Sequence, residues 1–300
     1  MPGIAILDLI GSARTAIETV EAFCVDTVVR KPLAGRTATL VSMHGKAAAI
    51  RPALARVGID VVGAAGIDTD RFGTFTREVK REGDALSALA RKWEAAGLEA
   101  DLVVASEGSF GPHPQLGLCA VGLEWVGLHS RRERWKVLGK DVSLDTNYGT
   151  RWVASVSEAR DFAAEVGFPS HALVVHGPVL HKGIVDDEHL AALVTQALAR
   201  GPSIQLETDM RAHVNPTRMR AIARAAEDLA LRLATLCPGC HEPGFGEVET
   251  ITGRPCAACG TPTWETQGAL WRCDRCGFMD ELRDTKISFA DPAHCELCNP

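Results

Sequence analysis

The sequence predicts a mixed-sheet α/β domain followed by a small C-terminal double zinc-ribbon module. Two observations support this prediction. Short β-rich runs alternate with amphipathic helical stretches through residues 36–236, as in α/β domains. Eight of the ten cysteines then gather in four Cys-x-x-Cys pairs within residues 237–300, a spacing typical of zinc sites. We therefore expect an N-terminal helical extension over residues 1–35, the α/β domain over 36–236 and the zinc-ribbon module over 237–300.

The composition is that of a globular protein. The chain has 300 residues, of which 46% are hydrophobic, and this is ample for one large and one small domain. No apolar run approaches the ~20 residues that a membrane span needs. The N-terminal residues MPGIAILDLIGSAR lack a basic n-region, so no signal peptide is expected. These observations favour a soluble cytoplasmic protein that does not bind a membrane; a homo-oligomeric state stays open.

The first predicted elements follow from periodicity. Apolar residues at steps of three and four over residues 4–30 predict an amphipathic helix. The run TATLVS predicts a strand that ends at Ser42, followed by a tight loop and a helix to Arg56. The runs IDVVGAA and DLVVAS predict two further strands, with a helix around residues 84–96 between them.

The second half repeats the alternation. LEWVGLH and RWKVLGK predict a hairpin that turns around residues 131–133, and HALVVH and SIQLE predict two later strands. Helices are expected near residues 157–166 and 187–200. Asn215 is a good N-cap and Pro216 suits the first helical position, so a long helix is expected to start there and to run into the cysteine-rich segment.

The Cys-x-x-Cys pairs supply enough thiolates for two closed tetrahedral zinc sites. The pairs are Cys237/Cys240, Cys256/Cys259, Cys273/Cys276 and Cys295/Cys298. Because GTPTWETQGALWR between the second and third pairs resembles a zinc-ribbon hairpin, we expect these inner pairs to share one ion and the outer pairs to share the other. A sequential pairing, first with second and third with fourth, stays open. Disulfides would require an oxidising compartment, and an Fe–S cluster is a further alternative to zinc.

Closed four-thiolate sites leave no coordination position for a substrate, so the two Zn²⁺ ions are expected to be structural. Residues 237–300 contain ten Asp and Glu against five Lys and Arg, out of a net charge of −6 for the whole chain. This local negative charge argues against a grip on a phosphate backbone, and a nucleic-acid partner is therefore not expected.

Candidate site residues are the polar clusters that directly follow apolar strand runs, because ligands of α/β sheets bind outside the carboxyl ends of the strands. The first cluster is His44-Gly45-Lys46. Its glycine frees the backbone, the following helix offers unpaired N–H groups, and Lys46 adds a positive charge, so the cluster suits a phosphate or carboxylate. A Gly-Lys turn before a helix also occurs in many domains without a ligand.

Three further clusters follow later strands. The second consists of Asp68, Asp70, Arg71 and Thr74, and the third of Glu107, Ser109 and His113. The fourth consists of Glu207, Asp209, Arg211, His213, Asn215 and Arg218. Carboxylate, hydroxyl and imidazole groups can hold a divalent metal or share acid–base work, although each cluster could also be a solvated turn. In an extended chain, alternation would put the odd-numbered residues of the fourth cluster on one side.

Several strings carry a resemblance to known proteins. HGK, GIDTDRFGTFTRE, ASEGSFGPHP, DTNY, ETDMRAHVNPTRM and CPGCHEPGFG together resemble a bacterial family of domains of unknown function over roughly residues 36–300. More remotely, the order of strand, HGK, helix, GDALSALARKW and a strand ending in ASEGS is similar to the layout of inosine triphosphate pyrophosphatases. That resemblance implies that Lys46 contacts a phosphate and that Glu107 lies near a magnesium ion. The sequence departs from those enzymes at Ser87, where they place a glutamate, so Asp84, or Glu207 and Asp209, would have to compensate.

The leading functional hypothesis is a divalent-metal-dependent hydrolase of a phosphorylated small molecule or nucleotide. Lys46, Arg211 and Arg218 would bind phosphates, and the other expected substrate-binding residues are His44, Asp70, Arg71, Ser109 and Asn215. Glu107, Glu207 and Asp209 would hold Mg²⁺ or Mn²⁺. The expected catalytic residues are Glu107, Asp209 and either His113 or His213 for proton transfer.

The alternative hypothesis is a non-enzymatic adaptor stabilised by zinc, which binds a ligand or a protein. The two hypotheses predict different structures. An enzyme should bring the four polar clusters together in one pocket, whereas an adaptor should scatter them and expose apolar side chains on the ribbons.

Overall fold

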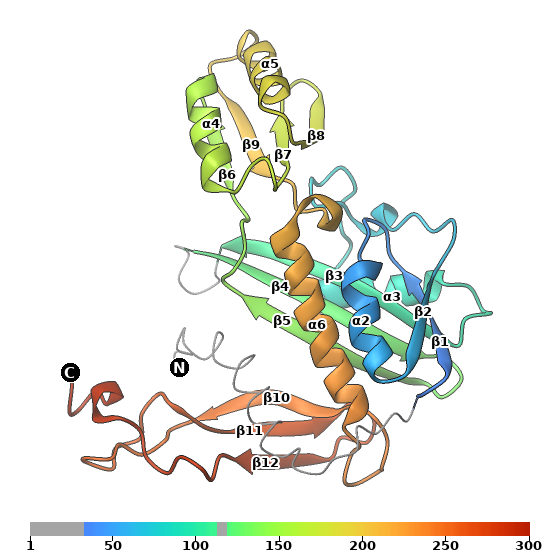
Figure 1. Ribbon diagram of the computed structural model, residues 1–300, viewed down its shortest axis with the longest axis vertical. Coiled ribbons are helices and arrows are strands. Elements are labelled where there is room, and N and C mark those ends of the chain that lie inside the picture. The colour runs from blue at the N-terminus through green and yellow to red at the C-terminus, as the bar shows by residue number, and fades with distance from the viewer. Residues whose placement is uncertain (1–32, 113–118) are drawn as a thin grey trace.

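The computed structural model describes residues 33–112 and 119–300, and these residues form three parts (Figure 1). A five-stranded sheet with three helices lies in the middle, a four-stranded sheet with two helices lies at one end, and a three-stranded sheet lies at the other. The predicted helix of residues 4–30 lies outside the described residues. Among the described helices, none is long and apolar enough to cross a membrane.

The central part is the expected mixed sheet. Its elements are β1 (Arg36–Val41), α2 (Ala47–Arg56), β2 (Ile59–Gly63), α3 (Ala85–Ala95), β3 (Leu102–Pro112), β4 (Ala120–Ser130), β5 (Trp135–Ser143) and α6 (Pro216–Ala234). The strand order is β2-β1-β3-β4-β5, with β1 parallel to both β2 and β3. β4 runs antiparallel to β3 and β5, so the predicted β4–β5 hairpin is confirmed.

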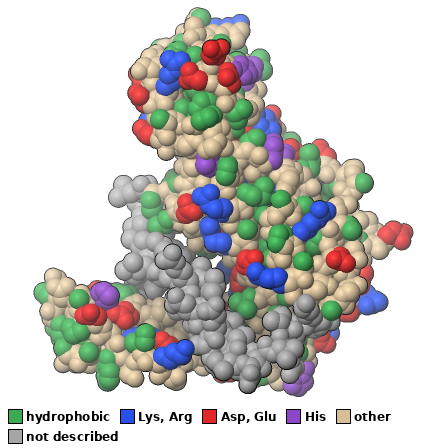
Figure 2. Space-filling model, viewed as in Figure 1, with side chains coloured by type: hydrophobic (Ala, Val, Ile, Leu, Met, Phe, Trp, Pro, Cys, Tyr) green, Lys and Arg blue, Asp and Glu red, His purple; other side chains and the backbone are tan. Residues whose placement is uncertain are grey.

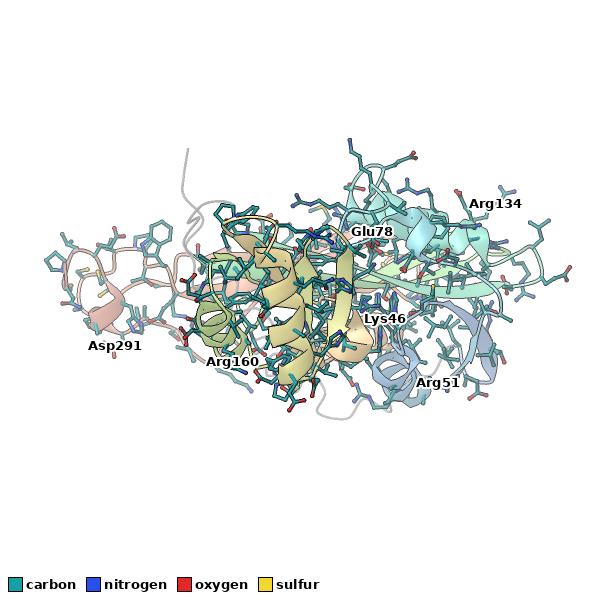
Figure 3. The ribbon with its side chains drawn as sticks, turned by 90° about the horizontal axis from the view of Figure 1, so that it is seen from above. Lys46, Arg51, Glu78, Arg134, Arg160 and Asp291 are labelled. Carbon is teal, nitrogen blue, oxygen red and sulfur yellow. The ribbon has the colours of Figure 1, made fainter. Side chains whose placement is uncertain are left out.

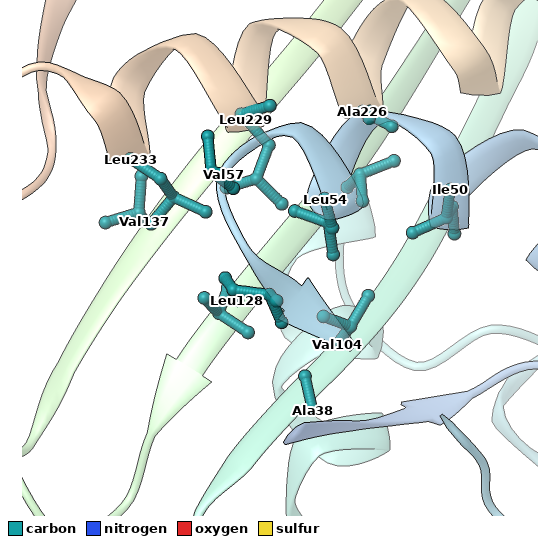
Figure 4. Packing of buried hydrophobic residues seen from close by; sticks show 14 of the residues in the cluster. Ala38, Ile50, Leu54, Val57, Val104, Leu128, Val137, Ala226, Leu229 and Leu233 are labelled. Carbon is teal, nitrogen blue, oxygen red and sulfur yellow. The ribbon is translucent and has the colours of Figure 1, made fainter. Parts of the chain in front are cut away.

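Helices cover both faces of the central sheet. α2 and α6 pack on one face, where Leu54 and Leu229 meet Leu128 of β4 (Figure 4). α3 packs on the other face, where Leu89 and Trp93 meet the buried valines and alanines of β1 and β3. Because both faces are covered, the central strands read as continuous apolar runs, and this is why they could be predicted from the sequence.

The close packing of α6 on β5 depends on Gly139. A Cβ atom at this position would lie 2.2 Å from the carbonyl oxygen of Ala225 and 2.3 Å from the amide nitrogen of Leu229. The helix backbone therefore lies directly against the strand, with no side chain between them. Only glycine allows this approach.

The end of the molecule next to the N-terminus of α6 is a small lobe, residues 150–208. Its elements are β6 (Thr150–Val153), α4 (Val156–Glu165), β7 (Leu173–His176), β8 (Leu180–Ile184), α5 (Asp187–Leu198) and β9 (Ile204–Thr208). Its strands are all antiparallel in the order β6-β9-β7-β8, and none of them pairs with the central sheet. The sequence indicated α4, α5, β7 and β9 but neither β6 nor β8, which are short and have one fully buried residue each.

α6 joins the small lobe to the cysteine-rich module across the central sheet (Figure 1). As predicted, Asn215 caps this helix, and its side chain accepts a hydrogen bond from the amide of Arg218. The helix ends at Ala234, three residues before Cys237. The C-terminal module then contains β10 (Phe245–Thr252), β11 (Thr266–Cys273) and β12 (Met279–Arg283), paired antiparallel in that order.

The approach of α6 to β5 gives a stability prediction. Gly139→Ala should lower the free energy of unfolding by about 3 kcal/mol or more, because the added methyl group would overlap two backbone atoms that cannot move independently. Gly63→Ala is the matched control, since a Cβ atom there meets nothing within 4 Å. Urea unfolding of the two variants beside the wild type measures the difference. Equal midpoints for the two variants would contradict this account of the helix packing.

Candidate functional site

A pocket of 610 Å³ lies where the carboxyl ends of β1 and β3 meet the small lobe. Each of the four polar clusters expected from the sequence contributes to its lining: His44 and Lys46, Asp70 and Thr74, Glu107 and Ser109, and Glu207, Asp209, Arg211 and Arg218. The loop of residues 73–83, between β2 and α3, supplies much of the remaining wall. The polar clusters therefore converge, which is the arrangement expected of an enzyme.

The lining of the pocket is cationic although the whole chain has a net charge of −6. Eight Lys and Arg side chains line it against four Asp and Glu side chains. The cations are Lys46, Arg77, Lys80, Arg81, Lys92, Lys182, Arg211 and Arg218. A concave site with an excess of positive charge concentrates anions, so the lining of this pocket favours a negatively charged ligand.

Lys46 stands at the start of α2, where the chain leaves β1. His44 and Gly45 both have positive φ, +63° and +71°, and this sharp turn places the side chain of Lys46 inside the protein. Its Nζ donates a hydrogen bond to the hydroxyl oxygen of Ser106 at 3.1 Å. Burial, and after it the neighbouring Arg218 and Lys92, lower the pKa of Lys46 to about 7. An anion in the pocket would restore its positive charge.

Glu107 is held between two cations. Its two oxygens accept hydrogen bonds from Lys92 at 2.5 Å and from Arg81 at 3.2 Å. Burial would raise the pKa of Glu107, but Lys92 and Lys46 more than offset this effect and keep the pKa below its usual value. The carboxylate is therefore ionised, and it fixes the ends of two cationic side chains at the pocket wall.

The acidic residues of the fourth cluster, Asp209 and Glu207, also form hydrogen bonds with neighbouring groups. Asp209 is buried, accepts hydrogen bonds from Arg211 through both oxygens, and accepts a further one from the amide of Gly183 in the small lobe. Glu207 pairs with His176 at 2.8 Å. Among the described residues, the carboxylates of Glu107, Glu207 and Asp209 do not gather within the span of one ion. The part of the chain that the structure describes therefore holds no preformed site at these three residues, and their expected role in binding Mg²⁺ or Mn²⁺ stays a prediction.

Arg218 points from the first turn of α6 towards the pocket. Its Nε donates to Glu124 on β4 at 2.6 Å, its Nη1 donates to the carbonyl of Met210, and its guanidinium stacks over Phe110 at 5.0 Å. Glu124 is fully buried, and its second carboxylate oxygen has no hydrogen-bond partner within the described part of the protein. These three contacts, with Glu124, Met210 and Phe110, hold the guanidinium group of Arg218 in place.

Glu124 and Lys92 were not predicted as site residues from the sequence. Glu124 lies inside the apolar run LEWVGLH, and an acidic residue within a buried strand was the one available signal. Lys92 lies within α3, and Lys182 lies within the short strand β8 of the small lobe. Lys182 pairs with Glu78 of the 73–83 loop and so joins the small lobe to the rim of the pocket. Figure 3 shows Lys46 and Glu78 near the centre of the molecule.

The other expected site residues have different surroundings. Arg71 does not line the pocket, and its guanidinium stacks over the ring of Phe72 at 4.7 Å. Asn215 is fully buried, where it caps α6 and donates to the side chain of Asn147. His213 stacks on His44 with ring centroids 4.9 Å apart. His113 lies outside the described residues.

The expected alternation of residues 207–215 is wrong. The chain turns after Asp209 and forms a short 3-10 helix at Ala212–Val214, so the odd-numbered residues do not share one side. The turn follows from local hydrogen bonds, because Asp209 accepts from the amide of Arg211 and Asn215 donates to the carbonyl of Asp209.

The eight cysteines of the C-terminal module form two groups of four. Cys237, Cys240, Cys273 and Cys276 make the first group, and Cys256, Cys259, Cys295 and Cys298 make the second. Sulfur–sulfur distances within the groups include 3.6 Å for Cys237–Cys276 and 3.9 Å for Cys256–Cys298. A tetrahedral ion with Zn–S bonds of ~2.3 Å requires edges of about 3.8 Å, so each group fits one zinc ion.

The pairing differs from both arrangements considered from the sequence. The first Cys-x-x-Cys pair joins the third, and the second joins the fourth, so the pairs interleave and the expected nesting is wrong. The cause is the β10–β11 pairing, in which Phe245 lies opposite Cys273. This register brings the chain before β10 next to the end of β11. The second pair lies at the opposite end of the hairpin, where Cys256 forms a bridge with Ala290.

Comparison with known protein families identifies the family to which this chain belongs. The family described as a domain of unknown function, DUF6671, matches residues 93–300. The chain belongs to this family. The match to DUF6671 begins within α3 and leaves out the His44–Lys46 turn, so it is shorter than the range 36–300 expected from the motifs. No curated protein and no solved structure matches the chain, so the likeness to inosine triphosphate pyrophosphatases stays a prediction.

The interleaved pairing of this DUF6671 protein can be tested with three exposed cysteines. Cys259→Ser/Cys298→Ser should lose one of two zinc ions, because both residues belong to the second group. Cys259→Ser/Cys276→Ser should lose both, because it damages one ligand in each group. Elemental analysis of the purified proteins counts the ions. Nested pairing requires the second variant to keep one ion and the first to keep none.

The buried position of Lys46 gives a pH prediction. The folded protein holds its pKa at about 7, whereas the unfolded chain restores the ordinary value of 10.5. Between these values the unfolded state binds the extra proton, so the free energy of unfolding rises with pH by up to about 1.4 kcal/mol per unit. Relative to Lys46→Met, the wild type should therefore gain stability from about pH 7 to about pH 10. Urea unfolding in phosphate-free buffers measures this, and a pH-independent difference would contradict the assigned burial.

Proposed function

We propose that this protein is a hydrolase that acts on a phosphorylated small molecule in the pocket between the central sheet and the small lobe. The excess of eight cationic over four acidic side chains in the lining is the observation that carries the proposal. Phosphates bind where positive charge, unpaired backbone N–H groups and a turn before a helix coincide. The turn at His44–Lys46 before α2 combines these features.

The pocket residues divide into phosphate-binding groups and groups that hold them. Lys46 and Arg218 would contact phosphate oxygens, since both line the pocket, Lys46 donates to the neutral hydroxyl of Ser106, and Arg218 is held in place by Glu124. Arg211 would contribute from the small lobe side. Glu124 and Asp209 keep the two guanidinium groups in place, and such orientation is a large part of catalysis in phosphoryl transfer.

A divalent cation would enter this site with the substrate. Mg²⁺ in phosphate-processing enzymes is usually held by one or two carboxylates together with substrate phosphates and water. Glu107 has a lone pair left on each oxygen beyond its bonds to Lys92 and Arg81, so it is the pocket carboxylate best placed to serve. Mg²⁺ or Mn²⁺ bound there would stabilise negative charge that develops on the phosphate. This supports metal dependence without a preformed metal site.

A second candidate function rests on the ribbon module. Trp264, Ile287, Phe289 and Leu297 are between 45% and 69% exposed, and all belong to the module that carries the second cysteine group. Figure 2 shows hydrophobic side chains on the visible face of this module. Such residues favour contact with another protein, as the adaptor hypothesis requires. The ribbon module and the pocket lie at opposite ends of α6.

The hydrolase proposal predicts turnover of a phosphorylated compound. The panel consists of inorganic pyrophosphate, nucleoside di- and triphosphates and sugar phosphates, each with Mg²⁺ or Mn²⁺, and phosphate or pyrophosphate release is measured. Lys46→Met should weaken substrate binding at least about tenfold, since it removes a charge-assisted contact. Lys136→Met is the matched control, because Lys136 is an exposed lysine of β5 outside the pocket.

Two results would contradict the proposal. One is the absence of turnover with every compound and both metals. The other is a Lys46→Met protein that hydrolyses its substrate as well as the Lys136→Met protein does. If one panel compound binds tightly but no compound is hydrolysed, the result would favour the adaptor hypothesis.

A further inference from the structure

His44 and Asp70 form a pair at the wall of the pocket that the sequence did not indicate. His44 follows β1, and Asp70 begins a short 3-10 helix 26 positions later. The Nε2 atom of His44 lies 3.2 Å from a carboxylate oxygen of Asp70. Both side chains line the pocket, beside Lys46.

The imidazole of His44 is held from a second direction. The ring of His213, from the short helix before α6, stacks on it with an interplanar angle of 14°. The side chain of His44 is 17% exposed, so the ring is largely enclosed and yet open to the pocket. A ring with one nitrogen bonded and one face stacked has little freedom to turn.

The backbone at His44 is unusual. Its φ of +63° lies in the left-handed region, which residues other than glycine rarely adopt, although histidine does so more readily than most. Gly45 follows in the same region with φ of +71°. Non-glycine residues in this conformation cluster at functional sites, where the surrounding structure maintains the strain. Here the turn directs the imidazole towards Asp70 and the pocket.

The hydrogen bond to Asp70 determines which nitrogen can accept a proton. An ionised carboxylate only accepts hydrogen bonds, so Nε2 carries the hydrogen and Nδ1 has the free lone pair. The charged and titratable neighbours of the ring are Asp70, His213 and Lys46. Burial lowers the pKa of His44 below 6.5, and although Asp70 opposes this effect the net direction is down. The imidazole is therefore neutral near pH 7.

We propose that His44, oriented by Asp70, is the general base that activates water in this pocket. This inference rests on the proposed hydrolysis. Nδ1 of His44 takes a proton from water as the water oxygen bonds to phosphorus. The bond between phosphorus and the leaving oxygen breaks, and that oxygen departs with the electron pair. The proton on His44 then returns to the leaving group or to solvent.

His44→Gly tests the base directly. Glycine adopts a φ of +63° freely, so this variant should fold while it lacks the imidazole. With the panel compound that the wild type hydrolyses fastest, kcat should fall about 10²-fold or more while KM changes little. Added imidazole should restore part of the lost kcat. His241→Gly is the matched control, because His241 has a similar φ of +59° outside the pocket and should leave kcat unchanged.

Asp70→Asn tests the orienting role. Asp70 raises the pKa of His44, so its removal should lower that pKa and move the acidic limb of the kcat/KM profile to lower pH, with a smaller kcat. An NMR titration of the imidazole signals in wild type and Asp70→Asn reports the same shift without any turnover.

The outcomes separate the two proposals. If no panel compound is hydrolysed by the wild type, the proposed hydrolysis fails and the general base fails with it, whatever the titration shows. If the wild type is active and His44→Gly keeps its kcat, the hydrolase stands and the general base is overturned. A loss of kcat in His44→Gly that imidazole does not relieve, with an unshifted acidic limb in Asp70→Asn, also overturns it.

Discussion

The contact between the backbones of α6 and β5 at Gly139 is the constraint on which the rest of the structure depends. With no side chain in between, the position of the helix axis is set by main-chain atoms, and main-chain atoms shift little when surface residues change. The first turn of α6 carries Arg218 into the pocket. Its last turn carries Arg232, which donates to the carbonyl of Glu247 in β10. One helix therefore sets the place of a pocket residue and of the cysteine module, whose first cysteine group lies at the end of α6 remote from the pocket.

The pocket combines a positive surface with buried acidic supports. Glu107, Glu124 and Asp209 each bind a lysine or arginine that lines the pocket, so the cations stay fixed before any ligand arrives. Removing Arg211 or Arg218 would leave the buried carboxylate of Asp209 or Glu124 without its cationic partner, at a cost of several kcal/mol. Lys46 differs, because its bonded neighbour is the hydroxyl of Ser106. Its charge responds to the ligand, whereas the charges of the paired arginines do not.

The sequence predicted the elements that are long and buried on both sides, and the clusters that follow them, but not how the clusters are used. β1, β3 and the cap at Asn215 follow from local sequence patterns, and so does the presence of two four-cysteine groups. The separate small sheet did not, because β6 and β8 have only four and five residues and little apolar periodicity. The predicted cysteine pairing is wrong because the pairing depends on the β10–β11 register, which is set by contacts between residues far apart in the sequence. The pair of His44 and Asp70 forms because α2 and the parallel strand β2 return the chain to the carboxyl end of β1, and the spacing of the two residues alone does not encode that.

The interleaving of the cysteine pairs imposes an order on the synthesis of the module. The first group is complete once Cys276 has left the ribosome, whereas the second waits for Cys298, 22 residues later. The segment enclosed by the first group already contains Cys256 and Cys259, so closing that group carries half of the second site into place. When Cys295 and Cys298 emerge, the sulfurs of Cys256 and Cys259 are therefore already in place. A metal ion can bind to the first group, next to α6, before one binds to the second group.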